Sequence, residues 1–145
     1  MAITCKQYGK ALYNALTKKI DLVNDTIKIM LCSSLYSPNQ DSHDFKDDVT
    51  NEVTGDAYTA GGATLASKTL EYSADNNVLK FDAADPSWSN ATITARYAVV
   101  YDDTPSGDGN KPLLCYIDFE TDKSSNAGTF SIVLPSDGLM KITVS

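Results

Sequence analysis

The chain has 145 residues, enough to bury a substantial core in a single domain without a metal ion or a disulfide framework. Its composition, 42% hydrophobic and 21% charged residues, excludes intrinsic disorder and a collagen-like repeat. The net charge of −7 argues against nucleic acid as a partner, because neutralising phosphates requires clustered Lys and Arg.

No apolar stretch in the sequence approaches the roughly 18 residues that a membrane-spanning helix needs, so we expect no membrane insertion. The sequence also begins without the charged region, apolar run and cleavage site of a secretory signal. These features predict a protein that is made in a cytoplasm.

The first element predicted in chain order is an amphipathic helix over residues 5–18. Thr4 and Gln7 have the spacing of a capping box, in which each side chain hydrogen-bonds the backbone of the other residue. Tyr8, Leu12 and Leu16 then recur every four residues, which is the period of an amphipathic helix.

A strand is predicted next, over residues 27–32, where Ile27, Ile29 and Leu31 occupy alternate positions. Residues 36–57 are polar and rich in acidic side chains, so we expect a long surface loop there. Six further strands, separated by turn residues, are predicted at residues 63–72, 78–82, 91–102, 112–119, 128–134 and 139–144. Gly61 and Gly62 are expected to form a turn or a kink.

This succession predicts a mainly β fold, an antiparallel β-sandwich or jelly roll with one N-terminal α-helix. We treat residues 1–145 as a single domain, with a helical segment over residues 1–24 and a β body over residues 25–145. Tyr97, Val99 and Tyr101 lie on one side of their strand and Ala98 and Val100 on the other, so both faces are apolar. A second sheet, the helix or a neighbouring subunit is expected to cover such a strand, and the last option predicts oligomerisation.

Charge is distributed unevenly along the chain. Residues 1–30 contain five Lys against two Asp, whereas residues 31–145 contain seven basic and 17 acidic side chains. Opposite charges orient association between proteins, so the basic start is a candidate docking segment. Its predicted docking residues are Lys6, Lys10, Lys18 and Lys19.

The residues that carry chemistry in enzymes form no motif in this sequence. His43 is the only histidine, lies in a polar loop and has no nucleophile signature nearby, so we expect an exposed loop residue. The three cysteines are too widely spaced for a disulfide framework or a zinc site, and we expect buried free thiols. The sequence therefore predicts no catalytic, cofactor or metal site and no enzymatic activity.

Two acidic clusters leave calcium binding open, because Ca²⁺ takes loop carboxylates as ligands. Neither cluster has the alternating spacing of a calcium loop, so solvated acidic loops are the favoured interpretation. The clusters are Asp41, Asp44, Asp47 and Asp48, and Asp102, Asp103 and Asp108.

The segments at residues 88–104 and 110–119 resemble a group of small proteins encoded by tailed bacteriophages. The similarity extends to the N-terminal helix, the strand at residues 25–31 and the strand at residues 128–132. The group is similar to auxiliary virion proteins of the capsid decoration, or cement, class. The resemblance implies a β-sandwich or jelly-roll homo-oligomer, a dimer or a trimer, that binds between major capsid protein subunits on the virion surface. It implies no active site and no cofactor.

Trp88, Tyr97 and Tyr101 are the residues predicted for an oligomer interface, where Trp and Tyr are enriched. For Trp88, packing in the core of its own chain is the commonest alternative. For the protein as a whole, the alternatives to capsid decoration are a phage tail or fibre component and a host-glycan-binding adhesin module that uses Trp88. A small glycan hydrolase is a third, more distant class.

Overall fold

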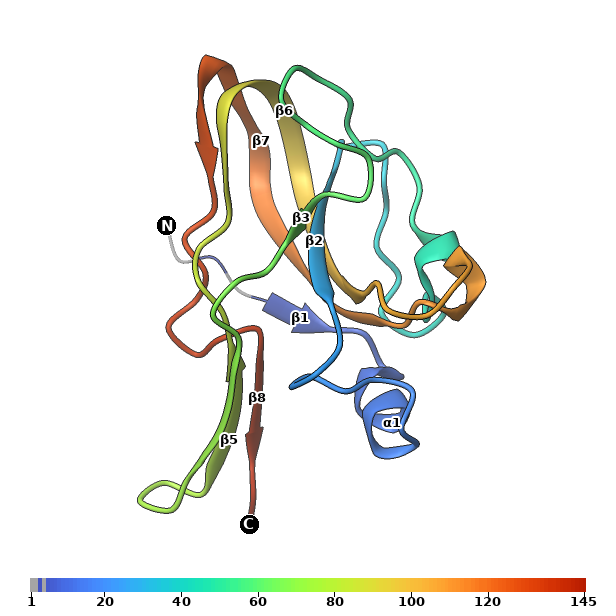
Figure 1. Ribbon diagram of the computed structural model, residues 1–145, viewed down its shortest axis with the longest axis vertical. Helices are drawn as coiled ribbons and strands as arrows, with labels where there is room; N and C mark the ends of the chain where they lie inside the picture. The colour runs from blue at the N-terminus through green and yellow to red at the C-terminus, as the bar shows by residue number, and fades with distance from the viewer. Residues whose placement is uncertain (1–2, 4) are drawn as a thin grey trace.

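The computed structural model describes Ile3 and residues 5–145. In this part of the chain it forms two antiparallel sheets and one short α-helix, α1 (Ala11–Leu16) (Figure 1). The five-stranded sheet has the order β1 (Cys5–Gln7), β7 (Leu113–Ser131), β6 (Ser87–Asp102), β2 (Ile27–Cys32) and β3 (Ala63–Thr64). The three-stranded sheet has the order β4 (Thr69–Ser73), β5 (Val78–Asp82) and β8 (Met140–Thr143). The predicted mainly β, antiparallel class with one helix is confirmed.

The start of the chain differs from the helix predicted over residues 5–18. Cys5 and Gln7 pair with Ile117 and Cys115, so residues 5–7 add an edge strand to β7 instead of opening a helix. Backbone pairing with an existing strand outweighs the local helical pattern. Thr4, half of the predicted capping box, lies outside the described residues.

The helix α1 also turns a different side toward the protein than its apolar period suggests. Ala11 and Asn14 are buried, whereas Leu12 and Leu16 are exposed. The small side chain of Ala11 faces the body of the protein, where α1 contacts β7. The larger apolar side chains therefore point away from the core.

The long hairpin of β6 and β7 forms the centre of the five-stranded sheet. Residues 112–119 and 128–134 were predicted as two strands with a turn at residues 122–126, but β7 continues through that segment. The polar residues there extend the ladder into a solvent-exposed arm, where strands need no apolar side chains. One example is the hydrogen bond of 2.8 Å between the hydroxyls of Thr94 and Ser124. Register shifts in the ladder, such as that between Ala95 and Tyr97, bend the hairpin.

The predicted strand at residues 63–72 is split between the two sheets as β3 and β4. Before β3, Gly61 and Gly62 have φ angles of 93° and 81°, which confirms the predicted turn. A Cβ atom on Gly62 would lie 1.9 Å from the carbonyl oxygen of Ile29, so the close approach of this turn to β2 requires glycine.

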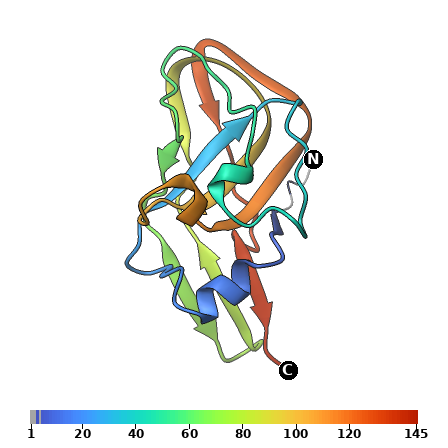
Figure 2. The same ribbon diagram turned by 90° about the vertical axis from the view of Figure 1, so that its right-hand side faces the viewer.

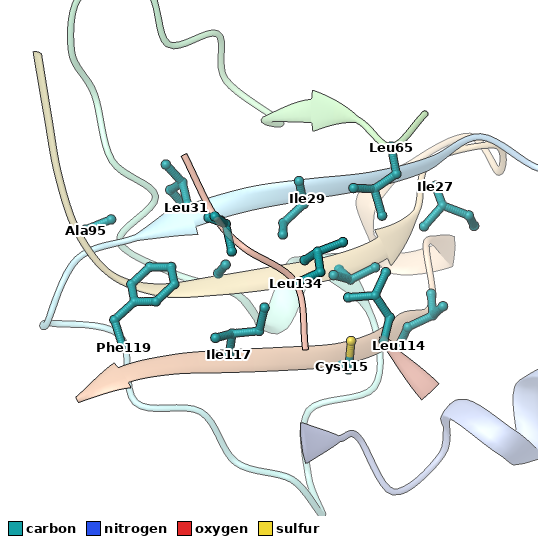
Figure 3. Close-up of a cluster of buried hydrophobic side chains, with 14 of the residues drawn as sticks. Ile27, Ile29, Leu31, Leu65, Ala95, Leu114, Cys115, Ile117, Phe119 and Leu134 are labelled. Atoms are coloured by element: carbon teal, nitrogen blue, oxygen red, sulfur yellow. The ribbon is translucent and has the colours of Figure 1, made fainter. Parts of the chain in front are cut away.

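One face of the five-stranded sheet, the aliphatic face, contributes most of the core (Figure 3). Alternate residues of β2 and β7, including Ile29 and Ile117, point into it and are fully buried. The segment that leads from β7 to β8 crosses this face and inserts Leu134. Phe81 and Met140 of the three-stranded sheet join the same cluster, which ties the two sheets together.

The opposite face, the tyrosine face, carries a second buried cluster built from Tyr8, Met30, Cys32, Tyr36, Val99, Tyr101 and Leu113. From the loop that follows β2, Tyr36 belongs to this cluster and Val49 packs against it, whereas Val53 joins the cluster of the aliphatic face. As predicted, residues 36–57 are largely irregular, with one 3₁₀ turn, η1 (Lys46–Asp48); a second 3₁₀ turn, η2 (Asp108–Asn110), lies in the β6–β7 connection. A loop, and not a second sheet or the helix, thus covers the second apolar face of β6.

The three-stranded sheet projects from one end of the molecule, with α1 beside it in both views (Figures 1 and 2). The C-terminus lies at the same end. Among the described residues, no helix is long and apolar enough to cross a bilayer.

Candidate docking surface

The basic start of the chain occupies β1, α1 and the turns that flank the helix. Lys6 lies on β1, Lys10 directly precedes α1, and Lys18 and Lys19 follow it. All four side chains are exposed. The structure therefore leaves all four predicted docking lysines accessible, and we call residues 5–24, which contain them, the basic segment.

Two of these lysines contact the loop at residues 36–57. Lys10 Nζ lies 2.8 Å from Asp44 Oδ2, and this hydrogen bond raises the pKa of Lys10. Lys19 Nζ lies 5.7 Å from the centroid of the Phe45 ring. Exposed contacts of this kind contribute little to stability, so carboxylates of a partner can replace them at low cost.

Apolar side chains surround these charges. Leu12, Tyr13 and Leu16 on α1 are 44%, 62% and 76% exposed, and Val23 in the following turn is 64% exposed. Surfaces that bind protein partners commonly combine an apolar contact area with a polar rim. The basic segment has both components, and the sequence had identified only the charges.

The aromatic residues predicted for an oligomer interface lie elsewhere on the molecule. Trp88 is 7% exposed and packs against Tyr58, with ring centroids 6.0 Å apart. Tyr101 is fully buried, and its hydroxyl donates to the carbonyl of Gly61 at 2.6 Å. The chain's own residues cover both side chains, and only Tyr97, which is half-buried, keeps an accessible part.

His43 is not the exposed loop residue that the sequence predicts. It is half-buried and stacks on Tyr36 with an interplanar angle of 24°. The backbone amide of Asn39 donates to His43 Nδ1 at 3.3 Å, so Nδ1 is an acceptor and the Tyr36 hydroxyl, 3.0 Å away, must donate to it. The Tyr8 hydroxyl in turn donates to the Tyr36 oxygen at 2.8 Å.

We call this chain of hydrogen bonds from Tyr8 through Tyr36 to His43 the tyrosine relay, and it connects the loop to the tyrosine face. Burial is the main cause that raises the pKa of Tyr8, and the hydrogen bond with Tyr36 adds to it. Burial also raises the pKa of Tyr36 to about 12. Both phenols are therefore neutral hydrogen-bonding groups at physiological pH, with a structural role.

In the acidic cluster of the loop, the Asp48 carboxylate accepts hydrogen bonds from backbone amides of the loop itself. Asp48 Oδ2 accepts the amides of Asp44 at 2.9 Å and Phe45 at 3.3 Å, which caps the turn η1. Asp44 is also the partner of Lys10.

Two members of the second acidic cluster, Asp103 and Asp108, pair with lysines. Asp103 lies 2.9 Å from Lys28 and 2.5 Å from Lys111. Burial disfavours its ionisation, but the two ammonium groups outweigh burial and lower its pKa. Asp108 pairs with Lys46 at 3.0 Å. Within Ile3 and residues 5–145, no group of three or more His, Cys, Asp or Glu side chains is placed to hold a metal ion.

Asp102, at the end of β6, is fully buried and has a different environment. Its Oδ1 accepts the amide of Thr104 at 2.9 Å, while Oδ2 has no donor. Burial, together with the facing carboxyl of Asp25, raises the pKa of Asp102 to about 7. Asp102 therefore keeps its proton up to about neutral pH, although it lies fully buried at the end of β6.

A hollow of about 550 Å³ beside β8 is lined by Cys5, Gln7, Asp137 and Lys141, among others. Its single carboxylate lies 3.2 Å from the ammonium of Lys141. As predicted, Cys32 and Cys115 are buried free thiols, whereas Cys5 is only half-buried.

Comparison of the chain with protein-family models, curated proteins and solved structures finds no match. The structure shows a mainly β, antiparallel protein, and its basic segment also carries exposed apolar side chains.

Proposed function

We propose that this protein is a non-enzymatic structural protein of a tailed bacteriophage, which decorates and stabilises the capsid by binding across major capsid protein subunits. The observation that carries the proposal is the basic segment. It combines four exposed lysines with the exposed side chains of Leu12, Tyr13 and Leu16, and residues 1–20 contain no acidic side chain. The resemblance of the strands at residues 88–119 to phage auxiliary proteins supports the same role.

In this proposal the basic segment faces the shell. Apolar side chains such as Leu16 supply the contact area, and the lysines orient the protein on an acidic rim of the capsid joint. The rest of the chain carries the excess of acidic groups and faces solvent. A displayed protein of this kind needs a folded body, which the two sheets provide.

Stabilisation of the shell follows from mass action. A protein that binds only the assembled capsid stabilises it by RT ln(1 + [L]/Kd), so each bound copy opposes the separation of the subunits that it bridges. No chemical step is required of the decorating protein.

The adhesin alternative depended on Trp88 as a stacking platform for a sugar. Because Trp88 is 7% exposed, the structure offers that alternative less support than the sequence did. A tail or fibre component stays open as an outcome of the experiments.

The proposal can be tested by adding purified protein back to phage particles that lack it. We expect the quadruple variant with Lys6, Lys10, Lys18 and Lys19 changed to Glu to lose at least about tenfold in affinity at low salt. Lys123→Glu, an exposed lysine on β7, is the matched control and should bind normally. Bound protein is measured by gel densitometry of sedimented particles.

Leu16→Asp tests the apolar part of the same surface. It should reduce binding at both low and high salt, because apolar contact is not screened by ions. Leu35→Asp, at a side chain that is 78% exposed outside the basic segment, is its control. Unchanged binding of both the quadruple variant and Leu16→Asp would refute docking through the basic segment.

A further inference from the structure

The three-stranded sheet has one polar and one apolar face. Residues directly opposite each other in an antiparallel ladder share a face. The observed register therefore places six apolar residues on one face, in the rows Leu70–Phe81–Met140 and Tyr72–Leu79–Ile142. The other face carries polar residues, including Glu71, Lys80 and Lys141.

Only part of the apolar face is covered by the protein itself. Near the body of the molecule, Phe81 and Met140 are 1% and 6% exposed. Toward the free end of the sheet, Tyr72 and Val144 are 53% and 51% exposed. A sheet of three short strands with such a half-covered face gains stability from further strands.

The sheet also has a free edge at β8. Its only strand partner among the described residues is β5. Val144 donates its amide to the carbonyl of Asn77 at the start of β5, at 2.7 Å. Since backbone groups alternate in direction along a strand, those of Met140 and Ile142 also point to β5, and those of Lys141 and Thr143 point outward. Lys141 and Thr143 are exposed, and the hollow of about 550 Å³ adjoins Lys141.

The outward groups of β8 are self-complementary. If a second copy pairs antiparallel about Ile142, each Lys141 exchanges backbone hydrogen bonds with Thr143 of the second copy. In the same register Ile142 opposes Ile142 of the second copy, and Met140 opposes Val144 of the second copy. Apolar residues meet on one face, Lys meets Thr on the other, and no like charges lie directly opposite each other.

The edge strand β4 does not have this property. The same alternation points the backbone groups of Leu70 and Tyr72 outward, so self-pairing in the register proposed for β8 would centre on Glu71. It would place two glutamates directly opposite each other, which is unfavourable. The charge pattern thus disfavours this register at β4, whereas the same register at β8 places no like charges opposite each other.

We propose that β8 is a homodimer interface, through which a second copy of this chain extends the three-stranded sheet into a six-stranded sheet across a two-fold axis. The dimer buries the exposed side chain of Val144 and satisfies the outward backbone groups of Lys141 and Thr143. The interface does not include Trp88 or Tyr101. Its formation does not depend on what the basic segment binds.

Charge variants at the two-fold axis test the pairing. The mass of the wild-type protein is measured by sedimentation equilibrium up to about 1 mM, because small strand-edge interfaces are weak. We expect a dimer whose dissociation constant rises at least about tenfold in Ile142→Glu and in Ile142→Lys. A mixture of the two variants should regain the dimer, because residue 142 opposes itself. Tyr72→Glu and Tyr72→Lys, on the same face at β4, should dimerise like the wild type.

A cysteine crosslink provides a second readout that introduces no charge. Residues opposite each other at a position without backbone hydrogen bonds lie about 4.5 Å apart at Cα, within the range that a disulfide spans. Oxidised Ile142→Cys should run as a covalent dimer on a non-reducing gel, whereas wild-type protein, with Cys5, Cys32 and Cys115, and Tyr72→Cys should not. A wild-type protein that stays monomeric at all concentrations overturns the proposal. A dimer that is indifferent to residue 142 and forms no crosslink through it also overturns it.

Discussion

The two faces of the five-stranded sheet are both apolar in sequence but are covered in different ways. The aliphatic face is sealed by branched and aromatic side chains from the segment that enters β8 and from the second sheet. The tyrosine face is covered in part by an irregular loop, which is held by the hydrogen bond between Tyr36 and His43, and by the turn before β3, where Gly61 accepts the Tyr101 hydroxyl. The first cover depends on shape, and the second depends also on satisfying polar groups.

The difference teaches that a strand with two apolar faces need not imply a subunit interface. In β6, Val99 and Tyr101 are as fully buried as Ala98 and Val100, and their cluster includes Tyr8 from the segment before α1 and Tyr36 from the loop. Tyrosine suits such a position, because its ring supplies apolar area while its hydroxyl bonds the polar cover.

The largest effect is expected from removing packing on the aliphatic face. Ile29→Ala should lower the free energy of unfolding by about 3 kcal/mol, because Ile29 is fully buried in the centre of that face and the lost methyl groups leave a cavity. Urea denaturation measures the loss. Leu16→Ala, at a side chain that is 76% exposed, is the matched control. A loss below about 1 kcal/mol in Ile29→Ala would show that this face is loosely packed.

The next effect concerns the one buried carboxyl at the end of the sheet. The pKa of Asp102 is raised to about 7 in the folded protein, against an ordinary value of 3.8. Between these values the folded state holds a proton that the unfolded state has released. Asp102 therefore disfavours folding increasingly as pH rises from about 4 to about 7, and the effect levels off above that.

Asp102→Asn should remove this dependence, because its amide donates to Asp25 without a proton exchange. Asp21 and Lys68, which contact Asp25, are present in both proteins. At pH 8 the variant should be more stable than the wild type by on the order of 2 kcal/mol, and at pH 4 the advantage should vanish. Thermal unfolding across this pH range measures the difference. Parallel stability curves for the two proteins would count against the raised pKa of Asp102.

A smaller effect is expected on the tyrosine face. Tyr36→Phe keeps the ring but leaves the Tyr8 hydroxyl and His43 Nδ1 without their common partner. The free energy of unfolding should fall by about 1–2 kcal/mol. Hydrogen exchange should speed up selectively in residues 36–57, because the relay fastens that loop. Tyr13→Phe, at a ring that is 62% exposed, should change neither quantity.

Much of the sheet could be predicted from local pattern. The alternation of Ile27, Ile29 and Leu31 predicted β2, and turn residues correctly separated β5 from its neighbours. The edge strand β1 could not be predicted in this way, because its partner Ile117 is distant in sequence. Nor could the single long β7, whose polar middle resembles a turn until it is paired with β6.

The contacts around the candidate site were partly visible in the sequence. The four lysines of the basic segment could be predicted, because charge is read directly from the sequence, and the structure leaves all four exposed. The exposure of Leu16 could not be predicted, because the helical period of Tyr8, Leu12 and Leu16 is also the pattern of a buried helix face. The relay from Tyr8 to His43 and the pairing of Asp25 with Asp102 join positions that no spacing rule connects.

The most direct test of the central proposal is cryo-electron microscopy of the phage particle that carries this chain. The proposal predicts density for the two-sheet body on the outside of the icosahedral head, over joints between major capsid subunits, with α1 and the lysines of the basic segment against the shell. Density for the chain on the tail or fibres, or a particle without the chain, would contradict it.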